Sequence, residues 1–261
     1  MPASRLLHLE SLLRARKLDV TLTSAQPLRQ IETASAPTGV SRLDARLEGG
    51  LPRGHVSELV GPRSSGRTWT TCAALAAATR RGELAALVDT LDAFDPQSAS
   101  AFDPDWSYLL WVRGRSLGSL GGGRPRSGRR DDDHPVRRAL DRAIKAAALV
   151  LSAGGFGLLV VDVAGVPSWA MRELPPATWL RLHRMVEGRD TVCLVMADEP
   201  VTRSAGGVSL RTHVPPGGSG CWRGQAPHAR LIEGIDLRLS ITRARFHPAD
   251  TQPIVIAGRP A

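Results

Sequence analysis

The stretch that decides the fold is Gly61-Pro62-Arg63-Ser64-Ser65-Gly66-Arg67-Thr68. An apolar run at 55–60 precedes it and an alanine-rich run at 68–81 follows it, so the sequence predicts a strand, a glycine-rich loop and a helix. This order fits the phosphate-binding P-loop pattern G-x-x-x-x-G-K-[ST] at every fixed position except the lysine, where Arg67 stands. The backbone N–H groups of such a loop and the positive end of the helix surround phosphate oxygens. We therefore expect the whole stretch, with Trp69 beside it, to bind a nucleotide and the Thr68 hydroxyl to hold Mg²⁺.

Arg67 keeps the positive charge of the expected lysine but spreads it over a planar guanidinium. The chain contains two lysines, Lys17 and Lys145, among its 34 lysine and arginine residues. The arginine at 67 is thus compatible both with a changed function and with a general drift from lysine to arginine, and the sequence does not decide between them.

Composition narrows the class of protein. The formal net charge of the 261-residue chain is +9, which favours an anionic partner, although charge that serves only solubility is an alternative. Its three cysteines, Cys72, Cys193 and Cys221, are widely spaced, which favours reduced thiols over disulfides or a zinc site. The first residues do not resemble a signal peptide and no apolar run has the length of a membrane span, so we expect a cytoplasmic protein without a membrane partner.

The pattern along the chain predicts an arm followed by a core. Leucines at helical spacing in 4–17 predict an amphipathic helix, and the polar residues up to 37 predict a linker. That helix docks either on a partner or neighbouring subunit, or on its own domain. The core is expected at 38–261, interrupted by a disordered surface insertion at 113–135 that is rich in glycine and arginine.

Strands and helices alternate through the core. Apolar runs predict strands at 55–60, 84–89, 109–112, 158–162, 191–196, 237–243 and 253–256. Helical periodicity predicts helices at 68–81, 134–153 and 179–187, and the residues from 201 to 229 are expected to be loop-like. The alternation favours an α/β fold, with a mainly parallel sheet covered by helices on both faces.

Carboxylates follow two of the predicted strands. Asp162 ends the apolar run at 158–161, the arrangement of a Walker B strand, and is expected to hold Mg²⁺. Asp89 ends the run at 84–88, and ligands of open α/β sheets lie at the carboxyl ends of the strands, so we expect the loop 89–95 to face the P-loop.

These stretches together resemble the core of the RecA recombinases. The residues that carry the resemblance are Thr38-Gly39, Leu43-Asp44, Gly49-Gly50-Leu51-Pro52-Arg53-Gly54, Glu58, the P-loop, Asp89, Ala93-Phe94-Asp95-Pro96 and Val160-Val161-Asp162. The resemblance covers residues 37–256 and implies a RecA-like fold, with ATP and Mg²⁺ as cofactors and single-stranded DNA as a weak, sequence-independent partner. It further implies that Asp95 lies near the adenine and that 164–176 and 199–229 take the places of the two DNA-binding loops. Three arginines of the second loop are candidate DNA contacts: Arg203, Arg211 and Arg223.

The departures from the family pattern concern catalysis. Leu91 stands where the family has the glutamate that activates water, and Asp92 beside it is the candidate replacement. The strand at 191–196 is followed by Ala197-Asp198-Glu199 and lacks the family's glutamine, and a carboxylate there is expected to repel phosphate. With Arg67, these changes imply weak or absent ATP hydrolysis.

Shortened, divergent RecA-like proteins of this kind resemble the ImuA group of translesion synthesis accessory factors. That resemblance implies a translesion polymerase or an inactive-polymerase-like subunit as partner, and self-association or a contact with RecA. Two alternatives stay open. One is an active DNA-dependent ATPase with Asp92 or Glu58 as the base. The other is a nucleotide-free interaction protein, such as a SulA-like regulator of cell division.

Overall fold

The computed structural model describes residues 34–120, 134–175, 177–202, 206–215, 220–223, 231–244 and 252–258. Contacts group Ala34–Ala261 into one unit. The predicted amphipathic helix at 4–17 lies outside the described residues, as does position 203. Among the helices described, none is both long enough and apolar enough to span a bilayer.

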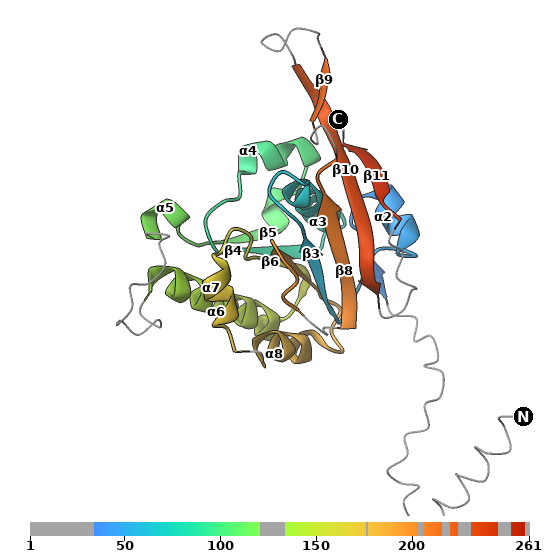
Figure 1. Ribbon diagram of the computed structural model, residues 1–261. Helices are drawn as coiled ribbons and strands as arrows, with labels where there is room; N and C mark the ends of the chain where they lie inside the picture. Colours follow the sequence, from blue (N-terminus) through green and yellow to red (C-terminus); the bar gives the residue numbers. More distant parts are fainter. Residues whose placement is uncertain are drawn as a thin grey trace, which may run out of the picture. The chain divides into compact units, whose positions relative to one another are not determined.

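One large sheet organises the described residues (Figure 1). Its strand order is β11-β10-β8-β3-β7-β6-β4-β5, and β9 also pairs with β10. Neighbouring strands from β8 to β5 run parallel, whereas β10 is antiparallel to β8, β9 and β11. The predicted mainly parallel sheet is therefore confirmed. The strands are β3 (Val56–Val60), β4 (Leu84–Asp89), β5 (Leu109–Arg113), β6 (Phe156–Asp162), β7 (Val192–Ala197), β8 (Gly206–His213), β9 (Gly220–Arg223), β10 (Leu231–Ala244) and β11 (Ile254–Gly258).

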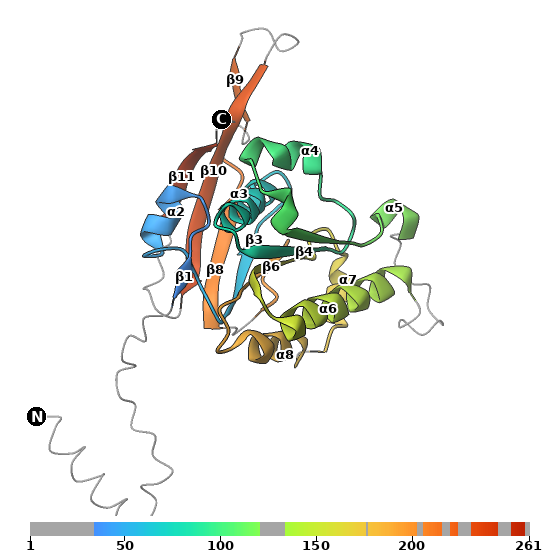
Figure 2. The ribbon, with the colours of Figure 1, turned by 180° about the vertical axis from the view of Figure 1, so that it is seen from behind.

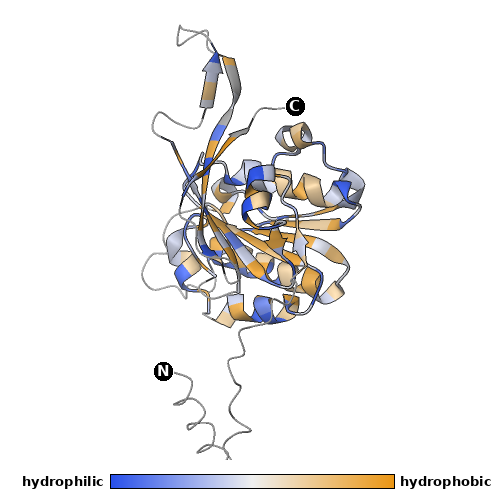
Figure 3. Cartoon of the chain, turned by 90° about the vertical axis from the view of Figure 1, so that its right-hand side faces the viewer, coloured by the Kyte–Doolittle hydropathy of each residue, from blue (hydrophilic) through white to orange (hydrophobic). Residues whose placement is uncertain are grey.

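Helices cover both faces of this sheet (Figures 1 and 2). Alternate side chains of a strand point to opposite faces, and β6 shows the consequence. Leu159 and Val161 join the core cluster beneath α6, α7 and α8, while Leu158 and Val160 join the cluster beneath α2 and α3. Figure 3 shows the apolar residues concentrated along the strands between these layers. The helices are α2 (Ser41–Arg46), α3 (Arg67–Arg80), α4 (Pro96–Ala99), α5 (Leu117–Leu120), α6 (Pro135–Ala153), α7 (Ser168–Arg172) and α8 (Ala177–Val186).

The longest helix, α6, begins and ends where its sequence predicts. Pro135 occupies its first position, and the His134 side chain accepts a hydrogen bond from the backbone N–H of Val136 at 3.2 Å. Gly154 ends the helix with a φ of 72°. The apolar stripe, which includes Leu140 and Leu151, is buried against the sheet.

Three expectations about local structure were wrong. The region 201–229 contains β8 and β9 rather than loop alone, and β8 lies beside the P-loop strand β3. The predicted linker contains the short strand β1 (Ser35–Ala36), which pairs with β2 (Leu51–Pro52). In the predicted insertion 113–135, Arg113 still belongs to β5 and α5 follows it, whereas 121–133 lie outside the described residues.

Two of the cysteines are packing residues. Cys72 on α3 and Cys193 on β7 are buried, and burial raises the pKa of each thiol to about 12. Their sulfur atoms are therefore protonated at neutral pH, as expected for reduced, unreactive cysteines.

Candidate nucleotide site at the P-loop

The strand order explains which residues meet at the P-loop. The P-loop follows β3, Asp162 ends β6, and β7 lies between these two parallel strands. Because parallel strands deliver their carboxyl ends to the same edge, the residue that follows β7 enters the same site. That residue is Asp198.

The P-loop backbone has the shape of a phosphate cradle. Ser64 and Gly66 adopt positive φ values of 58° and 95°, and Gly66 precedes α3 without any side-chain cap. The first N–H groups of α3 are thus left for an anion. Ser65 is buried, donates a hydrogen bond to Pro62 O at 2.6 Å and lies 2.5 Å from Thr212 Oγ1 on β8. This serine therefore holds the loop against the sheet.

Gly66 makes a testable contact with the antiparallel strand β10. A Cβ at this position would collide with Leu237 Cδ2, and the φ of 95° disfavours any L side chain. We expect Gly66→Ala to lower the free energy of unfolding by about 2–4 kcal/mol, as strain and overpacking combine. Urea denaturation measures the loss, and Gly82→Ala is the matched control, because Gly82 has a φ of 75° but nothing within 4 Å of its Cβ position. Equal losses in both variants would contradict the contact with Leu237.

Arg67 is already paired. Its side chain is 8% exposed, and its Nη1 donates to Asp198 Oδ1 at 2.6 Å. The other carboxylate oxygen of Asp198 accepts from the backbone N–H of Gly165 at 2.9 Å, in the loop that follows β6. The cation at the P-loop lysine position is therefore bound to a carboxylate of the same chain. The sequence identified Asp198 as a charge that would oppose phosphate, but gave no sign of this ion pair.

Asp162 lies at the same edge in a buried position. Its Oδ1 accepts from the backbone N–H of Ala164 at 2.8 Å. The pKa of its carboxyl group is raised to about 7, chiefly by burial. The charges of Asp89 and Asp198 add to this rise, while the Ala164 N–H and the charge of Arg67 oppose it. Asp162 is thus only partly ionised at neutral pH.

The raised pKa of Asp162 predicts a pH-dependent effect on stability. The folded state keeps the proton up to about pH 7, whereas the unfolded chain releases it near pH 4, so this group lowers stability progressively as the pH rises between those values. We expect Asp162→Asn to raise the free energy of unfolding by on the order of 2 kcal/mol at pH 8, since the buried charge is removed. The gain should shrink toward pH 4 in urea denaturation. A gain independent of pH would show that the carboxyl group does not titrate in this way.

The rest of the P-loop fits a nucleotide only in part. Pro62, Arg63, Ser64 and Thr68 are exposed, so the backbone cradle and the Thr68 hydroxyl are accessible to phosphate and Mg²⁺. The described residues contain no cluster of three or more histidine, cysteine or acidic side chains suited to a metal ion, so Thr68 and Asp162 would need phosphate oxygens to complete a Mg²⁺ site. Asp198 engages Nη1 of Arg67, so a phosphate would have to compete with this carboxylate for the guanidinium.

The loop after β4 is fixed by Asp89 rather than presented to a ligand. Asp89 is buried, and its two oxygens accept from the backbone N–H groups of Ala93 and Phe94, each at 2.9 Å. Leu91, at the position of the family's catalytic glutamate, is 8% exposed and packs in the core cluster with α6. It has no group that can take a proton.

The predicted base and the predicted adenine contact both have partners within the chain. Arg113 Nε and Nη2 donate to the two oxygens of Asp92 at 2.9 and 3.1 Å, and these bonds hold the pKa of the Asp92 carboxyl below its usual value. A carboxylate with a lowered pKa is a weaker base, so a catalytic role of Asp92 stays a prediction. Asp95 caps α4 by accepting from the N–H groups of Gln97 and Ser98, and the Ser98 hydroxyl chiefly lowers its pKa. Its adenine contact also stays a prediction.

Two further residues have structural contacts. Trp69 packs edge to face on Phe102, with the ring centroids 5.3 Å apart, and so borders the core cluster beneath α3. Glu58 is 1% exposed and accepts from Val201 N, Thr202 N and Ser209 Oγ. These three bonds give Glu58 a structural role, as its place inside β3 suggests.

The candidate DNA contacts do not form one patch in the described residues. Arg203 lies outside them, Arg211 is half-buried on β8, and Arg223 is exposed on β9. Arg211 pairs opposite Ser240 of β10, and Arg223 opposite Leu231. These positions are about 30 Å apart along the strand. Trp222, 55% exposed, accompanies Arg223 on the hairpin that extends beyond the sheet (Figure 1).

Comparison with known proteins agrees with this fold and this motif. A sequence model of the RecA N-terminal domain matches residues 18–113. Protein RecA of Salinispora tropica is 49% identical over 81 residues, which are 31% of this chain and 23% of that protein. Protein RecA of Nostoc sp. is 46% identical over 81 residues, covering 31% and 22% respectively. The chain thus matches about a quarter of the length of these curated relatives.

A solved structure extends the similarity beyond this segment. The crystal structure of the RadB recombinase superposes with a TM-score of 0.54 at 17% identity, covering 86% of this chain and 95% of that one. At this identity the match concerns the fold. The mainly parallel sheet, the P-loop after β3 and the RecA-related segment lead to one conclusion: this chain has a RecA-like α/β core.

Proposed function

We propose that this chain is a RecA-related accessory protein of DNA repair and damage tolerance, which binds nucleotide and single-stranded DNA with little or no ATP hydrolysis. Within that role we propose translesion synthesis in an SOS-type response, with a translesion polymerase or an inactive-polymerase-like subunit as partner. The relation to RecA supports the coarser part of this proposal. The finer part rests on the sequence resemblance to the ImuA group.

The observation that carries the proposal is the ion pair of Arg67 and Asp198. A P-loop cation acts on transferred phosphate by direct contact, and here it donates at 2.6 Å to a carboxylate instead. The position of the water-activating glutamate is a buried leucine, so one catalytic group is replaced and the other, Arg67, is paired with a carboxylate. The glycine-rich backbone, Thr68 and Asp162 are retained, which supports binding of ATP with Mg²⁺ without efficient turnover.

The test is ATP binding and ATP hydrolysis by the purified protein, with and without single-stranded DNA. We expect calorimetric ATP binding in the presence of Mg²⁺, and no DNA-stimulated release of phosphate. Arg67→Lys restores the usual cation and is expected to restore little hydrolysis, because Leu91 is unchanged. Turnover at the rate of an ordinary recombinase would contradict the proposal and favour a DNA-dependent ATPase. Absence of ATP binding would favour a nucleotide-free interaction protein.

DNA binding is tested by its dependence on salt. Contacts to phosphates release counterions, so the affinity for single-stranded DNA should fall steeply with salt and differ little between sequences. Fluorescence anisotropy with two unrelated oligonucleotides measures both properties. Affinity that does not change with salt would exclude a phosphate-dominated contact.

A further inference from the structure

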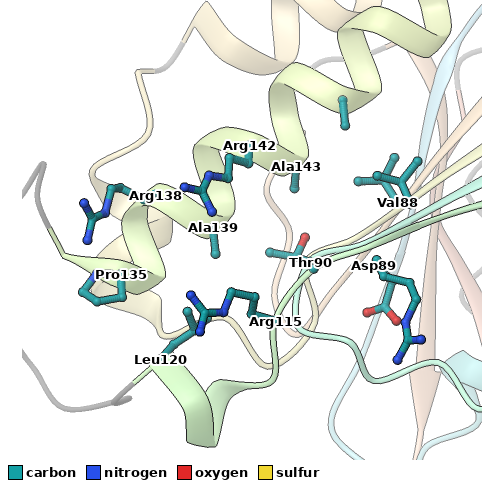
Figure 4. Close-up of a pocket in the computed structure, with 14 residues that line it drawn as sticks. Val88, Asp89, Thr90, Arg115, Leu120, Pro135, Arg138, Ala139, Arg142 and Ala143 are labelled. Carbon is teal, nitrogen blue, oxygen red and sulfur yellow. The ribbon is translucent and has the colours of Figure 1, made fainter.

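A cavity of about 260 Å³ lies apart from the P-loop (Figure 4). It is formed by the carboxyl ends of β4 and β5 and by the first turns of α6. No residue of 61–68 lines it. The nucleotide site described above therefore does not account for this cavity.

The cavity wall is strongly cationic. Arg113, Arg115, Arg138 and Arg142 line it, and Figure 4 shows side chains from the loop after β5 and from α6 around the same space. Arg113 is engaged by the carboxylate described above. For the other three arginines, the described part of the chain supplies no carboxylate partner.

Two of these arginines lie on one helix face. Arg138 and Arg142 are four residues apart on α6, a spacing at which like charges repel and weaken the helix. The first turn of α6 contains no acidic residue, so its positive end adds to the same potential. The acidic side chain that lines the cavity, Asp89, already accepts two backbone N–H groups. A bound anion would offset this concentration of positive charge.

A buried hydroxyl group lies in the same wall without a partner. Thr90 is 1% exposed, and its Oγ1 makes no hydrogen bond with any described residue. Buried hydroxyl groups nearly always have a hydrogen-bond partner, so Thr90 Oγ1 is left to donate to a group from outside the chain, such as water or a bound anion. In Figure 4 the Thr90 side chain lies between β4 and α6, with its oxygen directed toward α6.

The backbone brings the loop arginines close to this hydroxyl. Gly114 separates Arg113 from Arg115, and its N–H donates to Asp89 O at 2.7 Å. A Cβ on Gly114 would collide with the carbonyl group of Thr90, so only glycine lets the chain pass this close. The loop after β5 is therefore held against Thr90 by a contact that any side chain at 114 would prevent.

We propose that this cavity is a phosphate-binding site, in which Arg115, Arg138 and Arg142 supply the charge and the Thr90 hydroxyl donates to a phosphate oxygen. Arginine is suited to this role because its planar fork matches phosphate oxygens. The phosphate belongs either to a nucleic acid backbone or to a small phosphate ester. The assignment does not depend on nucleotide binding at the P-loop.

The test is calorimetric titration of the full chain with inorganic phosphate, against chloride at the same ionic strength. We expect Arg138→Gln/Arg142→Gln to weaken phosphate binding by about tenfold or more, and Thr90→Val to weaken it about threefold. The matched control is Arg181→Gln/Arg184→Gln, which removes the same charge from exposed positions of α8. Phosphate can also bind at the P-loop, so the quantity that tests the proposal is the loss of phosphate affinity in each variant relative to the wild type.

The outcomes distinguish a specific phosphate site from nonspecific attraction of phosphate to the positively charged surface. Retained affinity in the α6 variant, or an equal loss in the α8 control, would overturn the proposal, and so would a Thr90→Val variant that binds like the wild type. Thermal unfolding of each variant checks that the fold is kept. Competition then identifies the source of the phosphate. Displacement by a single-stranded oligonucleotide indicates a nucleic acid backbone, and displacement by a nucleoside monophosphate alone indicates a small ester.

Discussion

Replacing Asp198 by asparagine is expected to increase the affinity of the chain for ATP with Mg²⁺ by about tenfold, which corresponds to about 1.4 kcal/mol. The wild-type carboxylate competes with phosphate for the guanidinium of Arg67 and adds a negative charge at the edge where phosphate would bind. Asparagine removes that charge, and its carbonyl oxygen can still accept from the backbone N–H of Gly165. The expected gain is modest because Asp198 is 42% exposed, and water screens the pair.

Glu199→Gln is the matched control for this experiment. It neutralises the next residue of the same loop, which is exposed and forms no ion pair with Arg67. Isothermal titration calorimetry at constant ionic strength compares the two variants with the wild type. An equal gain in both would reveal a general effect of charge, and no gain in Asp198→Asn would mean that Arg67 is not held back by its partner. Hydrolysis should stay low in both variants, because neither supplies a base at Leu91.

Replacing Glu58 by leucine is expected to lower the free energy of unfolding by about 3–5 kcal/mol. The substitution leaves three donors without their acceptor, two of them buried and one part-buried, and a buried donor left this way costs about 1–3 kcal/mol. The donors are the N–H groups of Val201 and Thr202 and the hydroxyl of Ser209, so the loss falls on the junction of β3 and β8. Urea denaturation followed by circular dichroism measures it.

Two comparisons sharpen the Glu58 experiment. Glu58→Gln keeps one acceptor oxygen and should lose less stability than Glu58→Leu, whereas the exposed Glu187→Leu should change it by no more than about 0.5 kcal/mol. If Glu58→Leu is as stable as the wild type, the carboxylate is not needed for folding. That result would favour the alternative in which Glu58 acts as a catalytic base.

The parallel part of the sheet could be predicted from the sequence because its strands are fully buried. The strand at 84–89 was predicted with the bounds that the structure has, and β7 is shifted by one residue. Continuous apolar runs mark such strands without any knowledge of their neighbours. The same argument gave the P-loop, whose function depends on residues next to each other in the chain.

Strand β8 could not be predicted because its first residues are glycines, which suggest a loop in the sequence but allow close strand pairing in the fold. Gly206 and Gly207 indicate a loop when only local propensity is considered. In the structure, a Cβ on Gly207 would collide with Val56 O, so glycine here allows the β8 backbone to approach β3. The need for glycine at this position becomes apparent only from the pairing with β3, a strand about 150 residues earlier.

The residues of the candidate site could be predicted from the sequence, but the contacts between them could not. The sequence placed Arg67 in the P-loop and Asp162 and Asp198 at or just after strand ends. The ion pair between Arg67 and Asp198, however, spans 131 residues and requires β7 to lie between β3 and β6. The cavity beside Thr90 was likewise invisible, since its wall combines a strand end, a loop and a helix. The sequence offered one hint, the arginines around the predicted insertion.

The position of β7 between β3 and β6 has a consequence for how this protein can change over generations. The residue that follows β7 lies beside Arg67. A single codon, that of residue 198, therefore determines the charge next to Arg67. Asparagine is a single base change from aspartate in the genetic code. The nucleotide affinity of this site is thus expected to be a trait that one point mutation can reset, without altering the P-loop itself.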